Sequence, residues 1–340
     1  MMTELLKNLC NANGISGRED EVRKLILSEI EPFAQCKVDA LGNIIAFKKG
    51  KNAAASKVIL AAHMDEVGFM VNYITESGYV KIAPVGGIDQ RVVYGRRVII
   101  GKNKITGVIG AKAVHLLSGD ERNKVPDFSE MYVDIGAESR EEAEKYVSLG
   151  DSVYFDSDIY PFGDGFIKGK AIDDRAGCAI LIDMIKQEQP YDLYFVFTVQ
   201  EEVGTRGAKA AAFSLMPDKA IVVETTTAAD IAGVSGEKRV CELGKGPVVS
   251  FMDRGIVYDS ELYSLAFNIA ERENIPCQTK TLVAGGNDSA VIHVSGSGVK
   301  TVAVSLPCRY LHSPSCVIYE KDYEDAKKLI PLLAGEMASC

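Results

Sequence analysis

Four short apolar runs, each followed by acidic or histidine residues, constrain the fold of this chain more than any other feature. The runs are KVILAA at 57–62, LYFVFTV at 193–199, AIVV at 220–223 and TVAVSL at 301–306. Short runs rich in β-branched residues are typical of strands that are buried on both faces. Helical apolar patterns occur at 19–33, 175–187 and 259–272. Strands that alternate with helices predict an α/β layer fold with a mainly parallel sheet.

The segment 69–163 has a different pattern from the rest of the chain. It contains short β-rich runs punctuated by glycine, among them YVKIAPV and KITGVIGA, which are typical of small β-barrels and sandwiches. One helix is expected at 139–148, where Ser139 precedes two glutamates. Because chemistry-bearing motifs lie on both sides of this segment, we predict a catalytic domain of residues 1–68 and 164–340 with a small β-barrel domain, residues 69–163, inserted into it.

Charge and hydropathy argue against two classes of partner. The chain has 38 Lys and Arg against 47 Asp and Glu, a formal net charge of -9, which repels nucleic-acid backbones and anionic lipid surfaces. No apolar run reaches the roughly 18 residues of a membrane span, and the first residues lack the pattern of a secretory signal. The eight cysteines have no paired spacing, so most are expected to be buried thiols. We therefore expect a cytoplasmic protein that binds neither nucleic acid nor membranes.

Acidic and histidine residues follow the first two predicted strands. His63 and Asp65 lie at positions i and i+2, where an extended backbone directs both side chains to the same side, so Asp65 can orient the His63 imidazole. Glu201 and Glu202 follow the second strand, and consecutive carboxylates point to opposite sides. One of them can therefore bind a cation while the other moves protons.

Three further motifs complete the pattern. Asp173 and Asp174 are adjacent carboxylates, whose repulsion a bound cation relieves. Glu224 follows the third strand, with Asp230 a turn later, and His312 lies in a proline-bounded loop after the fourth. Each motif taken singly also has a structural explanation, as a hydrogen-bonded histidine, a helix cap or an exposed acidic pair. Together they are the ligand set of two divalent cations, with Zn, Co and Mn all compatible.

The ordered motifs resemble those of the glutamyl aminopeptidase and tetrahedral (TET) aminopeptidase family of dinuclear metallopeptidases, some of whose relatives are labelled endoglucanase or cellulase M. The similarity runs from NGISGREDEVR through AAHMDEVGFMV, AIDDRAGC and QEEVGTRGA to AGGNDSAVIHVSGSGVKTVAVSLPCRYLHSPS. It implies a zinc-peptidase-like α/β/α catalytic domain that hydrolyses N-terminal residues from peptides. It also implies a homo-oligomer built from dimers through the β-rich domain, up to a tetrahedral dodecamer.

The resemblance further implies a role for each site residue. Asp173 would bridge two metal ions, Glu201 would be the general base, and Asp65 would orient His63. The complete set of implied metal ligands is His63, Asp173, Glu202, Glu224 and His312.

Two positions depart from the family pattern. The family carries Asp where this chain has Glu224, so Asp230 is a fallback ligand for the first metal. The family's GGTDA appears as GGNDS, which keeps Asp288. Asp288 is a candidate contact for the amino end of a substrate, and Arg309 is a candidate anchor for a substrate carboxylate.

The expected mechanism uses a hydroxide that bridges the two metals, with Glu201 moving the proton. Three alternatives stay open. A carboxypeptidase or deacylase on the same framework would need an anchor such as Arg309. An endoglucanase would need two carboxylates and aromatic platforms, whereas the chain has no Trp. A non-enzymatic metal-binding scaffold is the third. The preferred N-terminal residue, acidic, aliphatic or basic, is also open.

Overall fold

The computed structural model describes residues 3–340, and an eight-stranded sheet lies at its centre. The strand order is β1-β2-β12-β3-β13-β16-β14-β15, and the four central strands β12, β3, β13 and β16 are mutually parallel. The bounds are β1 (Gln35–Val38), β2 (Ile44–Lys48), β12 (Leu193–Thr198), β3 (Val58–His63), β13 (Lys219–Thr227), β16 (Lys300–Cys308), β14 (Val248–Val249) and β15 (Gln278–Thr279). The predicted α/β fold with a mainly parallel sheet is confirmed.

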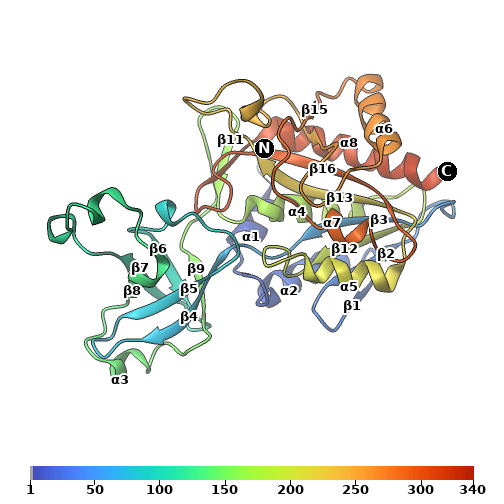
Figure 1. Cartoon of the computed structure of the whole chain (residues 1–340). Helices are drawn as coiled ribbons and strands as arrows, with labels where there is room; N and C mark the ends of the chain where they lie inside the picture. Colours follow the sequence, from blue (N-terminus) through green and yellow to red (C-terminus); the bar gives the residue numbers. More distant parts are fainter. Residues whose placement is uncertain (1–2) are drawn as a thin grey trace.

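Helices cover both faces of this sheet (Figure 1). Alternate residues of β3 point to opposite faces, so Leu60 and Ala62 pack in one hydrophobic core while Ile59 and Ala61 pack in another. The first core is shared with α1 (Glu4–Asn11), α2 (Asp20–Ile30), α4 (Ile172–Lys186), α6 (Ser260–Arg272) and α8 (Glu320–Ser339), and the second with α5 (Arg206–Leu215) and α7 (Ser289–Ile292). Both faces of the central strands are therefore buried, as their continuous apolar runs require.

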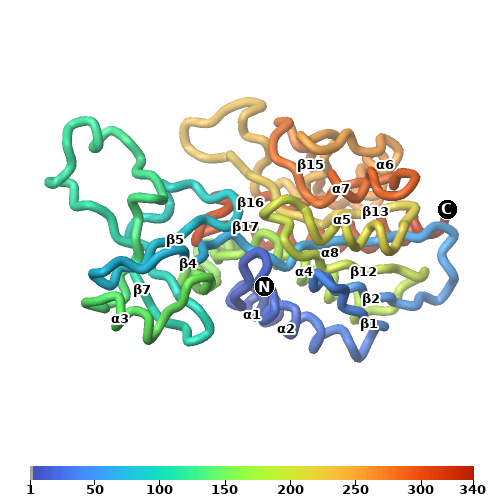
Figure 2. The backbone as a smooth tube through the Cα atoms, turned by 60° about the horizontal axis from the view of Figure 1, so that its bottom comes forward, coloured from blue at the N-terminus to red at the C-terminus, as the bar shows by residue number. Residues whose placement is uncertain are grey.

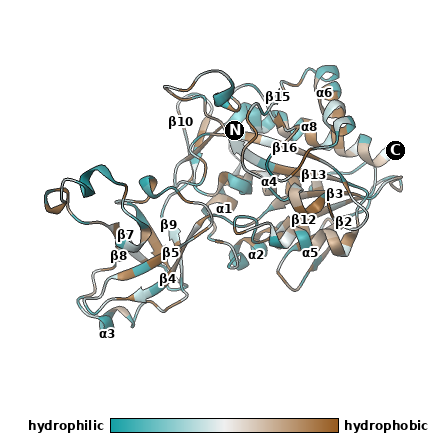
Figure 3. Cartoon of the chain, in the orientation of Figure 1, coloured by the Kyte–Doolittle hydropathy of each residue, from teal (hydrophilic) through white to brown (hydrophobic). Residues whose placement is uncertain are grey.

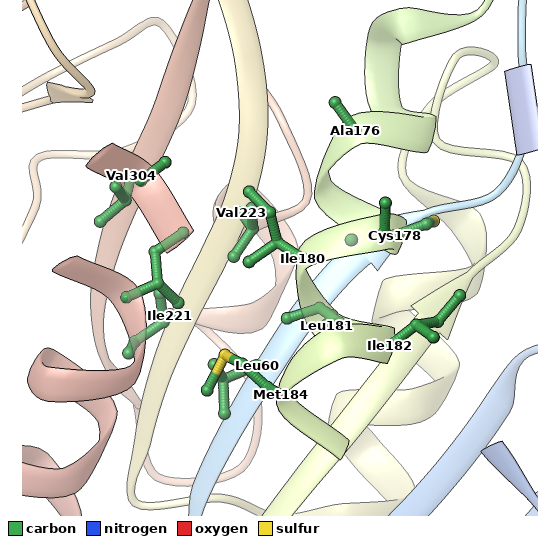
Figure 4. Close-up of a cluster of buried hydrophobic side chains, with 14 of the residues drawn as sticks. Leu60, Ala176, Cys178, Ile180, Leu181, Ile182, Met184, Ile221, Val223 and Val304 are labelled. Carbon is green, nitrogen blue, oxygen red and sulfur yellow. The ribbon is translucent and has the colours of Figure 1, made fainter. Parts of the chain in front are cut away.

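Helix α4 packs against the central strands of the sheet. Ile180, Leu181 and Met184 of this helix lie against Leu60 and Val223 of the central strands (Figure 4). Nearly every residue of α4 is buried, so its first turn is fixed relative to the ends of β3 and β13. That first turn contains Asp173 and Asp174, whose backbone angles depart from helical values.

The segment after β3 forms a closed six-stranded barrel with its own hydrophobic core. The barrel lies at one end of the molecule, beside the α/β part (Figure 2). Its strands are β4 (Gly68–Ile74), β5 (Val80–Val85), β8 (Tyr132–Asp134), β7 (Ile105–Gly110), β6 (Arg97–Ile100) and β9 (Ser152–Phe155). Hydrophobic residues concentrate in the strands of both parts (Figure 3). The role of the barrel in assembly stays a prediction.

A smaller three-stranded sheet connects the end of the barrel segment to the loop after β16. It is formed by β10 (Tyr160–Phe162), β11 (Phe166–Gly169) and β17 (Cys316–Tyr319). The helix expected at 139–148 is shorter in the structure, as α3 (Arg140–Ala143) with Ser139 at its N-cap. No helix within residues 3–340 is both long enough and apolar enough to cross a membrane.

Candidate metal centre

Six predicted side chains converge where the parallel strands of the sheet end. The carboxyl ends of neighbouring parallel strands lie side by side, so the loops that follow them meet at one edge. The residues and their elements are His63 at the end of β3, Glu224 within β13, Glu201 and Glu202 after β12, His312 between β16 and β17, and Asp173 in α4. Glu224 was expected after its strand, but β13 continues to Thr227, so this side chain projects from the strand itself.

One cluster forms around the Nε2 atom of His63. This nitrogen lies 3.2 Å from Oδ1 of Asp173 and 3.4 Å from Oε1 of Glu224. All three side chains are buried. One imidazole nitrogen and two carboxylate oxygens that face one another form a donor set suited to a divalent cation.

A second cluster forms around His312 on the other side of Asp173. The Nε2 atom of His312 lies 3.3 Å from Oδ2 of Asp173 and 3.3 Å from Oε2 of Glu202. Donor atoms of His63, Asp173 and Glu202 also lie within 4.8 Å of one another, so the two clusters adjoin. Asp173 presents one oxygen to each histidine.

Asp174 is close to the first cluster but is engaged elsewhere. Donor atoms of His63, Asp174 and Glu224 lie within 4.8 Å of one another. The Asp174 carboxylate, however, accepts hydrogen bonds from the backbone N–H of His63 at 3.3 Å and of Gly177 at 3.1 Å. Oδ2 of Asp174 thus holds α4 against β3, and Oδ1 holds the first turn of α4 itself, so Asp173 is the better candidate ligand.

Asp65 contacts the His63 ring and also the backbone of Glu201 and Glu202. Its backbone carbonyl lies 3.0 Å from Nδ1 of His63, closer than its carboxylate at 3.5 Å. The carboxylate accepts hydrogen bonds from Ser16 Oγ at 2.6 Å and from the backbone N–H groups of Glu201 and Glu202 at 3.0 and 3.1 Å. Burial raises the pKa of Asp65, but hydrogen bonds from His63, Ser16 and Glu201 outweigh it and keep the pKa below its ordinary value. A charged Asp65 therefore pins the backbone of both glutamates.

The loop that carries His312 has an unfavourable backbone conformation. Tyr310 and His312 have φ angles of 58° and 57°, which cost non-glycine residues about 1–3 kcal/mol each. Side-chain hydrogen bonds hold the loop in place, since Ser313 Oγ donates to the carbonyl of Tyr310 and Ser157 Oγ to that of Pro314, each at 2.6 Å. The surrounding structure thus fixes the direction of the His312 ring.

Burial shifts the pKa values of the clustered side chains. It raises the pKa of Glu202 to about 8, with His312 opposing and Asp173 adding to the rise. It also raises the pKa of Glu224 to about 7 and that of Glu201 well above its ordinary value. Burial disfavours the charged form of His312, but its hydrogen bond to Asp173 and the charge of Glu202 raise its pKa to about 10. A bound divalent cation would relieve this crowding of carboxylates.

A cavity of about 660 Å³ opens onto both clusters, a size suited to one end of a peptide. Glu201 and Asn287 line it. Lys280 is the one lysine or arginine among the described residues that line this cavity. Its Nζ donates a hydrogen bond to the carbonyl of Ala284 at 2.7 Å. The cavity is therefore lined by the carboxylates of both clusters and, among the residues that the structure describes, by one lysine.

Three further predicted residues are not brought into the clusters. Asp288 is buried and accepts a hydrogen bond from Thr198 Oγ1 at 2.6 Å, whereas its neighbour Asn287 lines the cavity. Arg309 makes a two-pronged ion pair with Asp230, with both N···O distances at 2.7 Å. Asp230 is therefore occupied by Arg309, and Glu224 takes the place beside His63.

The sequence patterns did not indicate Ser16 or Lys280. Ser16 lies in the turn that follows α1, far in sequence from Asp65. Lys280 follows the two-residue strand β15 at the edge of the sheet. No local pattern distinguishes either residue from the other serines and lysines of the chain, so their proximity to the centre depends on the tertiary fold.

Comparisons with known proteins show which proteins this chain resembles. The sequence profile of the M42 glutamyl aminopeptidase family matches residues 42–329. A protein of Acetivibrio thermocellus, named only provisionally as an aminopeptidase, is 43% identical, with 97% of each chain covered. The lysyl aminopeptidase of Pyrococcus furiosus is 34% identical, with 98% of this chain and 97% of that chain covered. A solved TET1 peptidase of Pyrococcus horikoshii, which can assemble into a tetrahedron or a large octahedral shell, superimposes with a TM-score of 0.87 at 36% identity, covering 98% of this chain and 99% of that one.

Proposed function

The chain belongs to the M42 glutamyl aminopeptidase family, and from this premise we propose that it removes N-terminal residues from peptides with the help of two divalent cations. The single observation that carries the proposal is the position of Asp173 between two His and Glu pairs, with one oxygen 3.2 Å from His63 and the other 3.3 Å from His312. A hydrolase activity follows from family membership, while the cations and the residue roles are our proposal.

The donor set fits two cations that share Asp173. His63 and Glu224 would complete one, and His312 and Glu202 the other. Such mixed nitrogen and oxygen sets suit Zn, Co or Mn. When bound, a pair of divalent cations polarises the scissile carbonyl and lowers the pKa of a shared water molecule from 15.7 toward about 7.

Glu201 is the proposed general base. Its side chain lines the cavity beside the clusters, and its backbone N–H is held by Asp65 at 3.0 Å. The Glu201 carboxylate would take a proton from the attacking water and give it to the leaving amine. Because it is not needed as a ligand, it stays free for this transfer.

Lys280 supports a preference for acidic N-terminal residues. It is the one lysine or arginine among the described residues that line the same cavity as Glu201 and the two clusters. A substrate carboxylate that replaces the carbonyl of Ala284 as the partner of Nζ would form a charge-assisted hydrogen bond. The matching family is named for glutamyl aminopeptidase, which suits this preference, whereas the Pyrococcus furiosus relative is a lysyl aminopeptidase. Competition between glutamyl and lysyl substrates would show which N-terminal residue this protein prefers.

The carboxypeptidase or deacylase alternative is less well supported. Its conceivable anchor, Arg309, is paired with Asp230. An endoglucanase needs aromatic rings that stack on sugars, and no Phe, Tyr or Trp is among the described residues that line the cavity. Hydrolysis of a free hexapeptide followed by mass spectrometry tests the proposal. Stepwise shortening from the amino end in the presence of zinc supports an aminopeptidase, whereas shortening from the carboxyl end refutes it.

We also propose that the protein is a cytoplasmic homo-oligomer built from dimers, up to a tetrahedral dodecamer. The assembly of the Pyrococcus horikoshii relative supports this. The barrel segment also leaves Val114 and Leu116 largely exposed, as expected of side chains that a second subunit covers. Light scattering that gives a monomer at all concentrations would refute the proposed assembly.

A further inference from the structure

The segment 14–16 lies against the residues that follow β3. The N–H of Glu66 donates to the carbonyl of Gly14 at 2.9 Å, and the N–H of Gly14 donates to the Glu66 carboxylate at 3.1 Å. The buried Lys170 fixes this arrangement, because its Nζ contacts Glu66 at 2.8 Å and the carbonyl of Ala12 at 3.1 Å. The segment is therefore fixed to the turn that contains Glu66, although it precedes the residues 42–329 that match the family profile.

Ser16 is the residue of this segment whose side chain contacts Asp65. Its Oγ donates to Oδ2 of Asp65 at 2.6 Å, and both side chains are buried, at 7% and 0% exposure. Short hydrogen bonds from a hydroxyl to a carboxylate are among the stronger ones in proteins. The same Oδ2 accepts the N–H of Glu202 at 3.1 Å, and Oδ1 accepts the N–H of Glu201 at 3.0 Å. Asp65 thus links Ser16 to the backbone of both glutamates.

We propose that Ser16 is a positioning residue, which acts through Asp65 to set the backbone of Glu201 and Glu202, the general base and one cation ligand of the proposed function on which this inference rests. The Ser16 hydroxyl fixes the rotation of the Asp65 carboxylate about its terminal bond, a torsion with broad intrinsic preference. With that rotation fixed, each carboxylate oxygen faces one glutamate N–H.

Removal of the hydroxyl loosens this arrangement without removing any ligand. In Ser16→Ala, the N–H of Glu202 is the remaining hydrogen-bond donor to Oδ2 of Asp65 within residues 3–340. The carboxylate can then rotate, and the two glutamate N–H groups lose a fixed acceptor. Groups that orient metal ligands from behind typically change metal affinity or activity by about 10- to 100-fold when they are removed. Since Ser16 acts through one intermediate residue, we expect the lower end of that range.

The decisive test uses hydrogen exchange on the cation-free full-length protein, which needs no activity. A typical hydrogen bond contributes about 0.5–1.5 kcal/mol, so Ser16→Ala should speed exchange of the Glu201 and Glu202 amides by roughly 2- to 12-fold. Ser152→Ala is the matched control, because Ser152 is equally buried at 7% exposure but lies in β9 of the barrel. Unchanged exchange in Ser16→Ala, or an equal increase in Ser152→Ala, would overturn the proposal.

Kinetics and zinc titration give a second readout. In Ser16→Ala, kcat per bound zinc should fall about tenfold with KM little changed, and the zinc Kd should rise by a similar factor. A loss of folded protein with wild-type kcat per bound zinc would show a purely structural role and overturn the proposal. If zinc-loaded wild type cleaves no peptide, the proposed function fails, while the exchange experiment still decides the role of Ser16.

Discussion

The Oε1 atom of Glu224 lies 3.4 Å from the Nε2 atom of His63. The Glu224 carboxylate is therefore within reach of the His63 ring, at a position where the motif of the family that the sequence resembles has Asp. Residue 224 projects from within β13, which continues to Thr227.

Substitutions of Glu224 should weaken zinc binding to different degrees, depending on whether a carboxylate is kept. Glu224→Asp keeps a carboxylate and should retain zinc binding and activity within about tenfold, whereas Glu224→Gln should weaken zinc binding by at least about tenfold. Isothermal titration with zinc, together with kcat on a peptide p-nitroanilide, measures both effects. Wild-type zinc affinity in Glu224→Gln would remove Glu224 from the ligand set.

Glu201 should separate catalysis from cation binding. Glu201→Gln removes the proposed base but keeps a side chain of the same size, so we expect kcat to fall by about 10²–10⁴-fold. Zinc content per subunit, measured by plasma mass spectrometry, should stay at the wild-type level. A variant that keeps its zinc and its full kcat would exclude Glu201 as the base.

Lys280 should govern the choice of N-terminal residue. Hydrogen bonds to charged groups contribute about 1.5–3 kcal/mol, so Lys280→Ala should lower kcat/KM for a glutamyl p-nitroanilide by roughly 10- to 100-fold. The leucyl p-nitroanilide serves as the control and should change little. Equal losses on the two substrates would show that Lys280 does not read the substrate side chain.

Removal of cations should make stability fall as pH rises. Burial raises the pKa of Glu224 to about 7 and that of Glu202 to about 8, above the unfolded value of about 4.3. The cation-free native state therefore binds more protons than the unfolded state between about pH 4.5 and 8, and its free energy of unfolding decreases across that window. The raised pKa of His312, about 10, acts in the same direction above pH 6.5.

Added zinc should reverse this trend, because cation binding requires deprotonated ligands. At a concentration 100 times its Kd, a bound cation adds about 2.7 kcal/mol to the free energy of unfolding. Urea denaturation at pH 5 and pH 8, with chelator or with zinc, measures both slopes. A chelated protein that is more stable at pH 8 than at pH 5 would contradict the burial of these carboxylates.

The sequence predicts the framework of the site because that framework follows from periodicity. Apolar runs that end near His63 and Glu201 identify central strands, and parallel strands bring their ends together. The pairing of Arg309 with Asp230 could not be predicted, since it depends on how the loop after β13 folds back on β16. The contact of Ser16 with Asp65 could not be predicted for a similar reason, because it is long-range in sequence and is made by a single hydroxyl group.

The division between ligand and support was also beyond the sequence. Asp173 and Asp174 are adjacent in sequence and carry the same carboxylate group, so either could bind a cation. Only the fold shows that Asp174 accepts hydrogen bonds from the His63 and Gly177 backbone, while Asp173 faces both histidines.

Anomalous diffraction at the zinc edge, from crystals of the zinc-loaded protein, would locate the proposed cations directly. We predict two peaks in each subunit, both about 2.0–2.2 Å from Asp173. One peak should be bound by His63 and Glu224, and the other by His312 and Glu202. A single peak, or two peaks that do not share Asp173, would contradict the proposed centre.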